Sequence, residues 1–154
     1  MRLAAFAALV ALSACASTPP VSPDSQAAVE AAFADVVAVV SAPDTDTDSF
    51  APLVAYRGGD AARNYRAPVD PSSATERAAA STLLAGLRAI VEGGRTADGR
   101  FVYEVAEYVH EPTDEADWHV LRLDVGVLEN DQTSEMEAAF VPGPDGFLLA
   151  RIAN

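Results

Sequence analysis

The chain has 154 residues and carries 23 acidic against 10 basic side chains, which gives a formal net charge of −13 at pH 7. A chain of this length is typical of one domain rather than two. Half of its residues are hydrophobic, which excludes disorder of the whole chain. So acidic a surface repels phosphate groups and lacks the basic patch on which nucleic-acid binding depends. The composition therefore excludes nucleic acid, and electrostatic docking on anionic lipid headgroups, as expected partners.

The N-terminus has the parts of a secretory signal peptide. Met1-Arg2 supplies a positive charge, and residues 3–12 form an uninterrupted apolar run that leads into Leu12-Ser13-Ala14-Cys15. The run is about half the ~20 residues that a bilayer-spanning helix needs, so a permanent transmembrane anchor is disfavoured. Leu12-Ser13-Ala14-Cys15 resembles the lipobox of bacterial lipoproteins.

The lipobox resemblance implies cleavage before Cys15, a thioether-linked diacylglycerol on its sulfur and acylation of the new amino terminus. Two or three acyl chains hold a protein durably on a membrane, which makes the membrane the implied partner. Ala16 is compatible, by the same resemblance, with sorting to the outer membrane of a two-membrane cell. The alternative is an ordinary thiol behind a signal peptide that is cleaved elsewhere. Because Cys15 is the only cysteine, the mature domain has no internal disulfide or catalytic thiol.

Residues 16–25 are rich in Pro, Ser and Thr and predict an extended tether, so a single globular domain is expected over residues 26–154. An apolar stripe at helical spacing predicts an amphipathic helix over residues 26–40, capped by Asp24 or Ser25. The stripe consists of Val29, Phe33, Val36, Val37 and Val40. Residues 44–49 alternate Asp with Thr and predict a solvated acidic loop, because the glycine and the glutamate of an EF-hand are missing.

Ser73 followed by Glu76 forms a capping box and predicts a second helix over residues 74–92, which Gly93-Gly94 ends. Its expected buried stripe is Leu83, Leu84, Leu87, Ile90 and Val91. After this helix the apolar period changes to two, and strands are predicted over residues 100–110, 118–128, 134–141 and 146–153. The short polar links favour antiparallel hairpins. We therefore predict an α+β domain in which two helices pack on a four-stranded antiparallel meander.

This order of elements is similar to that of NTF2-like (cystatin-like) domains, as is the last strand, Gly146-Phe147-Leu148-Leu149-Ala150-Arg151-Ile152. The resemblance covers about residues 26–153. It implies a curved, cone-shaped sheet that wraps the helices around a pocket. It implies no particular activity, because such folds serve both enzymes and plain binding modules.

The candidate ligand-binding residues lie in the segment 56–66 and are Arg57, Asp60, Arg63 and Tyr65. Its two adjacent glycines permit a close backbone approach, and arginine guanidinium groups bind carboxylate or phosphate bidentately. The segment resembles a Tyr-Arg-Gly-x-Asp-x-x-Arg pattern of uncharacterised bacterial lipoproteins. It is the predicted place for an anionic ligand on an acidic protein. The simpler alternative is structural: Asp60 pairs with Arg57 or Arg63, and the aromatic rings pack.

His110 and His119 are the only histidines and flank the predicted hairpin turn. With a carboxylate from that turn, such as Asp117, two imidazoles can hold Zn²⁺. Neither histidine lies in a recognised metal motif, and histidines at strand ends are more often surface residues. No metal and no other cofactor is therefore predicted.

Glu104 and Glu107 lie three positions apart in the first strand and are expected on opposite faces of the sheet. The core face would then hold Phe101, Tyr103, Val105, Glu107 and Val109. An inward Glu107 would have a raised pKa and would line a pocket. The simpler explanation is exposure at the edge of the sheet or an ion pair with Arg122 on the next strand. Nucleophile elbows, phosphate loops and dinucleotide fingerprints are missing from the sequence, and no catalytic residue is assigned.

The sequence predicts a lipid-anchored envelope protein whose domain is a non-catalytic binding module for a small molecule or a peptide. One alternative is an interaction or structural component of an envelope assembly, which would use a sheet face or edge. Another is a small NTF2-like hydrolase or isomerase, which would need a His, Asp or Glu deep in a pocket.

Overall fold

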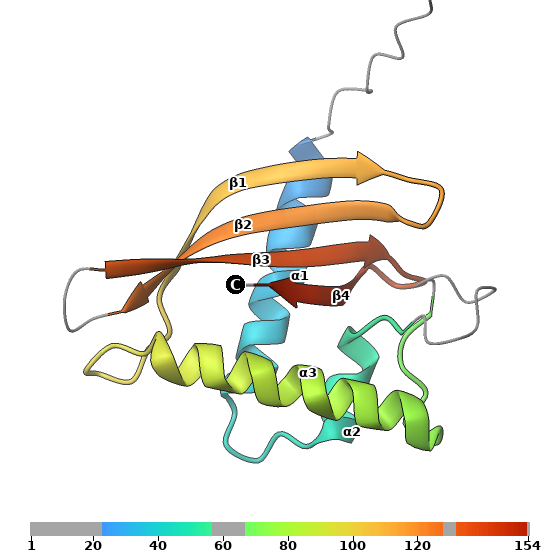
Figure 1. Cartoon of the computed structure of the whole chain (residues 1–154), viewed down its shortest axis with the longest axis horizontal. Helices are drawn as coiled ribbons and strands as arrows, with labels where there is room; N and C mark the ends of the chain where they lie inside the picture. Colours follow the sequence, from blue (N-terminus) through green and yellow to red (C-terminus); the bar gives the residue numbers. More distant parts are fainter. Residues whose placement is uncertain (1–22, 57–66, 128–131, 154) are drawn as a thin grey trace, which may run out of the picture.

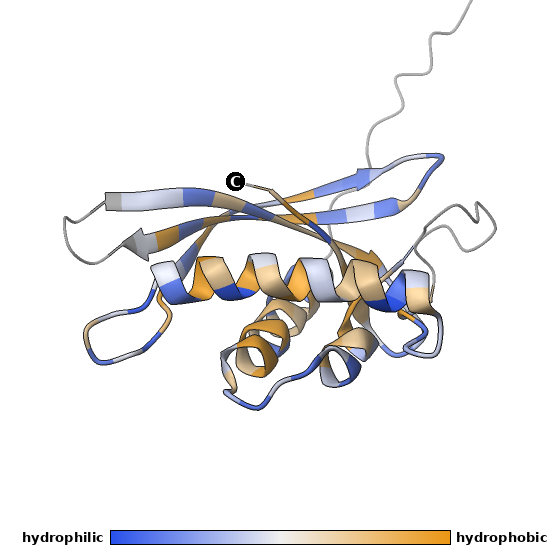
Figure 2. Cartoon of the chain, turned by 60° about the horizontal axis from the view of Figure 1, so that its bottom comes forward, coloured by the Kyte–Doolittle hydropathy of each residue, from blue (hydrophilic) through white to orange (hydrophobic). Residues whose placement is uncertain are grey.

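The structure, a computed structural model, describes residues 23–56, 67–127 and 132–153. Over these residues the chain forms helices on one side of an open four-stranded antiparallel sheet with the strand order β1-β2-β3-β4, which confirms the predicted α+β class and meander (Figures 1 and 2). The elements are α1 (Pro23–Ser41), α2 (Thr47–Phe50), the 3-10 helix η1 (Ala51–Leu53), α3 (Ala74–Gly93), β1 (Tyr103–Pro112), β2 (Asp117–Val127), β3 (Gln132–Pro142) and β4 (Phe147–Ala153).

Helix α1 begins at Pro23, before the predicted start at Gln26. Proline is favoured in a first helical turn because the N–H that it lacks has no partner within the helix there. The predicted caps Asp24 and Ser25 are therefore wrong: both residues lie inside the first turn, where the charge of Asp24 favours the positive end of the helix dipole. The predicted stripe is confirmed, with Val37 half-buried and the other members buried.

Helix α2 corrects the prediction of a loop over residues 44–49. The Asp46 carboxylate accepts hydrogen bonds from the Ser49 backbone N–H, at 2.9 Å, and from the Ser49 hydroxyl, at 2.8 Å. These bonds cap a short helix and lower the pKa of Asp46 below its usual value. Phe50, which is fully buried, anchors the helix in the core, and Asp48 forms an ion pair with Arg77 of α3 at 3.1 Å.

Helix α3 begins with one half of the predicted capping box. The Ser73 hydroxyl accepts from the Glu76 backbone N–H at 3.4 Å, as expected. The Glu76 carboxylate, however, accepts from the backbone N–H of Asp70 at 2.8 Å, and the Ser73 N–H donates to the Asp70 carbonyl. The side chain of Glu76 thus ties the helix to the segment that leads into it.

The end of α3 at Gly93-Gly94 is confirmed, but for a reason of space rather than of backbone conformation. Gly94 has an ordinary φ of −94°. A Cβ atom at Gly94 would lie 2.7 Å from both the Phe101 ring and the Val125 side chain. The glycine therefore lets the chain after the helix pass close to β2.

The core lies between the helices and one face of the sheet. Phe33 of α1 meets Tyr103 and Phe140 edge to face, with ring centroids 4.9 and 6.4 Å apart. The buried strand residues on this face are Leu121, Leu123, Val125, Met136, Ala138, Phe140 and Leu149. Helix α1 packs against β2 and β4, and α3 crosses beneath the sheet (Figure 1). We call this side the helix face and the other side the open face.

A β-bulge at Ala106 changes which side chains of β1 point toward the helices. The register runs from Val105 opposite Leu123 directly to Glu107 opposite Arg122, so Ala106 has no partner. Before the bulge Tyr103 and Val105 lie on the helix face, whereas after it Tyr108 and His110 do. The expectation that Glu107 and Val109 point inward is therefore wrong, because a bulge reverses strict alternation.

Candidate functional site

The histidine cluster consists of His110, Asp117 and His119, at the turn end of the β1–β2 hairpin. Thr113 closes the turn by accepting from the Ala116 N–H and by donating to the Ala116 carbonyl. This turn sets His110 directly opposite His119 in the register. Because Asp117 lies two residues before His119 on the same strand, it shares their face of the sheet.

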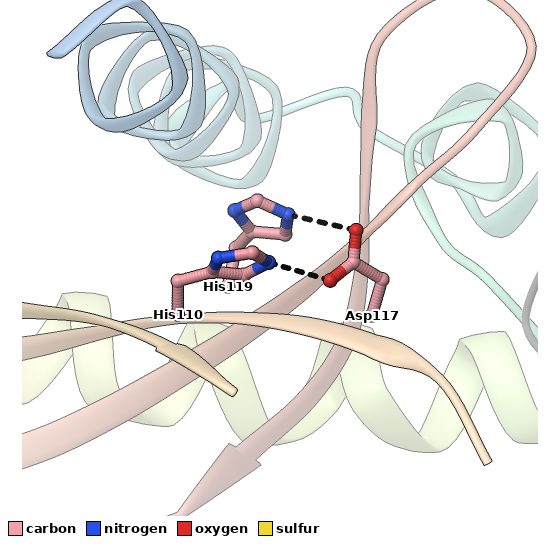
Figure 3. A group of neighbouring side chains, drawn as sticks. All are labelled: His110, Asp117 and His119. Carbon is pink, nitrogen blue, oxygen red and sulfur yellow. Dashed lines mark hydrogen bonds and ion pairs between the residues drawn. The ribbon is translucent and has the colours of Figure 1, made fainter. Parts of the chain in front are cut away.

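The three side chains of the histidine cluster converge, as Figure 3 shows. His110 Nε2 lies 2.5 Å from Asp117 Oδ1, and His119 Nε2 lies 3.6 Å from Asp117 Oδ2. The two imidazole rings stack with their centroids 4.5 Å apart. The side chain of His119 is only 6% exposed and that of His110 is 18% exposed, whereas that of Asp117 is 48% exposed. The cluster is therefore enclosed on the imidazole side and open on the carboxylate side.

His119 is held from behind by two aromatic residues. Its Nδ1 atom is 2.6 Å from the Tyr108 hydroxyl, and the Phe147 ring meets the imidazole at 4.6 Å. Burial lowers the pKa of His119 below its usual value, although the nearby Asp117 carboxylate acts in the opposite direction. Burial, with the charge of Asp117, raises the pKa of Tyr108. At neutral pH these shifts favour a neutral imidazole and a protonated phenol.

The open face carries two transverse rows of charged side chains. In the paired row, Arg122 lies between Glu107 and Glu137, at 2.5 and 3.1 Å from their carboxylate oxygens. Both carboxylates raise the pKa of Arg122. The pairing of Glu107 with Arg122, the alternative to an inward Glu107, is thereby confirmed.

The second row, the acidic row, has Glu104, Asp124 and Glu135 directly opposite one another on β1, β2 and β3. Like charges at directly opposed positions destabilise a sheet. The two rows border a hollow of about 850 Å³, which we call the open-face groove. It is lined by Ala106, Glu107, Arg122, Leu123, Asp124, Glu135, Met136, Glu137 and Ala153.

The other end of the open face is apolar. Val141 and Leu148 are buried with Ala55, and Trp118 packs on this group. The Arg151 guanidinium lies over the Trp118 ring at 5.4 Å from its centroid. The charged rows and the apolar end divide this face into two distinct regions.

The structure does not describe the residues that the sequence predicts for lipidation and ligand binding. Cys15 and the ligand candidates Arg57, Asp60, Arg63 and Tyr65 lie outside the described residues. The described residues next to that segment run along the edge of the sheet: Val54 pairs with Leu149, and Ala55 with Pro68. What the sequence missed are the burial of His119 and the open-face groove.

The expectation that histidines at strand ends are surface residues is wrong for His119, because the residue as a whole is only 4% exposed. A signal was present in the chain: from Asp117 to Val125, alternate residues form a core-facing series that includes His119, Leu121 and Leu123. No comparable pattern in the sequence predicted which face His110 occupies, because the bulge at Ala106 determines it.

Comparisons with known proteins add no family: no family model, no curated protein and no solved structure matches the chain. Among the helices of the described ranges, none is long and apolar enough to cross a bilayer. The proposals for the function of this protein therefore rest on its residues and their geometry.

Proposed function

We propose that the chain is a lipid-anchored protein of the cell envelope whose domain is a non-catalytic binding module. The N-terminal Leu12-Ser13-Ala14-Cys15, with the apolar run before it, supports the lipid anchor on Cys15. The open-face groove supports binding, because concave surfaces with a few convergent polar groups are the usual ligand sites of proteins. The groove is the observation that carries the proposal.

The ligand of the groove carries positive charge on a flexible chain, as a polyamine or a short lysine-containing peptide does. Arg122 is already engaged by two carboxylates at 2.5 and 3.1 Å. The acidic row, in contrast, places Asp124 directly between two further carboxylates. Cationic groups of a ligand relieve this cross-strand repulsion, and the overall charge of −13 attracts cations over a longer range.

The anchor is tested by mass spectrometry of the protein from its own cells. We expect a cleaved chain that begins at Cys15 and carries acyl groups, found in the membrane fraction. A Cys15→Ser variant should lose both the acyl mass and the membrane association. An unmodified Cys15 in the exported protein would refute the anchor and leave the groove proposal standing.

The groove is tested by titrating the protein with spermidine, a lysine-containing tripeptide and an acidic tripeptide, while backbone amide signals are followed by NMR. We expect the two cationic ligands to shift the signals of Arg122, Asp124 and Glu135, and the acidic peptide to shift none. Asp124→Asn should weaken binding, whereas Asp44→Asn, the same charge change at an exposed residue between α1 and α2, should not. Equal weakening by the two variants would mean diffuse attraction to an acidic surface.

A further inference from the structure

We propose that His110, Asp117 and His119 form a binding site for a divalent transition-metal ion of the zinc class. The site lies on the helix face and goes beyond the proposed function, which uses the open face. Each residue offers one ligand atom, and the three atoms lie within 4.8 Å of one another. A tetrahedral zinc ion with ligand distances of ~2.0–2.2 Å holds its ligand atoms ~3.4 Å apart.

The two contacts of Asp117 with the histidines lie on either side of that separation. Its Oδ1 atom is 2.5 Å from His110 Nε2, and its Oδ2 atom is 3.6 Å from His119 Nε2. The second distance is too long for a hydrogen bond. Both distances lie within about 1 Å of the spacing that a shared ion requires, and the half-exposed Asp117 side chain has room to adjust.

The surroundings of His119 orient it as metal ligands are oriented in proteins. A ligating histidine usually engages its second ring nitrogen with a fixed polar partner, and this partner sets the tautomer and the ring orientation. Here Tyr108 contacts Nδ1 at 2.6 Å, and Phe147 packs edge-on against the ring. Nε2 is therefore the nitrogen that faces Asp117 and His110 (Figure 3).

The donor set selects the class of ion. Two imidazole nitrogens and one carboxylate oxygen suit Zn²⁺ and its first-row neighbours, whereas Ca²⁺ and Mg²⁺ prefer oxygen ligands alone. Asp117, with 48% of its side chain exposed, provides the side from which an ion enters. A water molecule from that side completes a four-coordinate ion with three protein ligands.

The composition makes the test direct, because the cluster contains both histidines of the chain and Cys15 is its only thiol. The full chain with Cys15→Ala is titrated with Zn²⁺ by calorimetry, and the imidazole signals are followed by NMR. We expect one Zn²⁺ per chain and a shift of the signals of both histidines. The same concentrations of Ca²⁺ and Mg²⁺ should leave these signals in place.

Three variants test the assigned ligands. Asp117→Asn keeps the shape of the side chain and removes the anionic donor, and His110→Ala removes the more exposed imidazole; each should weaken binding by roughly 100-fold or more. Tyr108→Phe, which removes only the hydroxyl behind His119, should weaken it by about 10- to 100-fold. Asp114→Asn, an equal charge change at an exposed position of the same turn, is the matched control and should bind as the parent does.

The proposal is overturned if Zn²⁺ does not bind, if it binds without shifting the histidine signals, or if Asp117→Asn and Asp114→Asn weaken binding equally. Thermal unfolding of each variant without metal establishes that its fold is retained. The Asp124→Asn variant separates the two proposals, because it should lose affinity for the cationic ligand of the groove and keep its affinity for Zn²⁺.

Discussion

The two faces of the four-stranded sheet are built from the same strands and handle charge in different ways. On the helix face the two histidines and Asp117 of the hairpin meet at one end, in the histidine cluster, where Tyr108 and Phe147 contact His119. On the open face the paired row and the acidic row run across the strands and face solvent. Of the two, only the paired row includes a basic side chain, Arg122. Along each strand, alternation places neighbouring side chains on opposite faces and so keeps these two chemistries apart.

One irregular residue determines which face of the sheet the side chains of β1 occupy. Ala106 has no cross-strand partner, and the faces of β1 exchange at this point. Glu107 consequently joins Arg122 on the open face, and His110 joins His119 on the helix face. Bulges are common beside functional sites because they redirect side chains in this way.

The largest difference between the faces is expected in stability. Phe140 on the helix face is fully buried, and Phe140→Ala should lower the free energy of unfolding by about 3–5 kcal/mol through lost burial and a residual cavity. Glu135→Ala, on the open face of the same strand, should change it by less than about 0.5 kcal/mol. Urea unfolding measures both; similar losses would contradict the assignment of the core to one face.

Deleting Ala106 should move the side chains of β1 that precede it to the other face of the sheet. The hairpin fixes the register of the residues that follow position 106. Without the bulge, the residues before it shift by one position, so Tyr103 and Val105 turn toward the open face. The loss of their burial should cost about 2–3 kcal/mol of stability. Urea unfolding gives the size, and loss of the Tyr103 contacts with Phe33 in NMR spectra gives the cause. An intact Phe33–Tyr103 contact in the deletion variant would refute this account of the bulge.

A smaller effect is expected from pH on the metal-free protein. Because burial lowers the pKa of His119 in the folded state, the unfolded chain takes up more protons as the pH falls below about 6.5. The free energy of unfolding should therefore decrease from pH 7 toward pH 5. NMR titration in the presence of a chelator should give His119 a pKa below that of a free histidine, and a His119→Asn variant should lose this part of the pH dependence.

The smallest effects should have opposite signs in the two charged rows. Asp124→Asn removes repulsion in the acidic row and should raise the free energy of unfolding by about 0.2–1 kcal/mol. Arg122→Ala leaves Glu107 and Glu137 without their cation and should lower it slightly, because these groups are solvent-exposed. Both changes should shrink in 1 M salt. The same sign for the two variants would remove the distinction between the rows.

Much of the fold was predictable because periodicity in the chain reports burial directly. The stripe around Phe33 predicted α1, the pair Ser73 and Glu76 predicted the start of α3, and the short polar links predicted the meander. Helix α2 was missed because its cap, Asp46 with Ser49, stands in a stretch without an apolar period. Patterns of apolar residues thus identify long elements and overlook a helix of one turn.

The candidate sites were less predictable than the fold because they depend on registers between strands. The proximity of the two histidines followed from a short hairpin turn. Their position on the same face of the sheet depends on the bulge at Ala106, and no pattern in the local sequence predicts this bulge. The acidic row likewise exists only because Glu104, Asp124 and Glu135 come into register, and these residues are up to thirty-one positions apart in the sequence.

The packing of α1 against β4 has a consequence for the order in which the domain assembles. Synthesis delivers α1 first, with the apolar side chains of Val29, Phe33, Val36 and Val40 ready for burial. The meander forms from neighbouring strands, which are quick to find one another. Two strands pack on α1, and β4, which completes the sheet, is made after the other three described strands. Until β4 is made, the apolar stripe of α1 therefore lacks part of its packing surface, and exposed apolar surface of this kind favours aggregation.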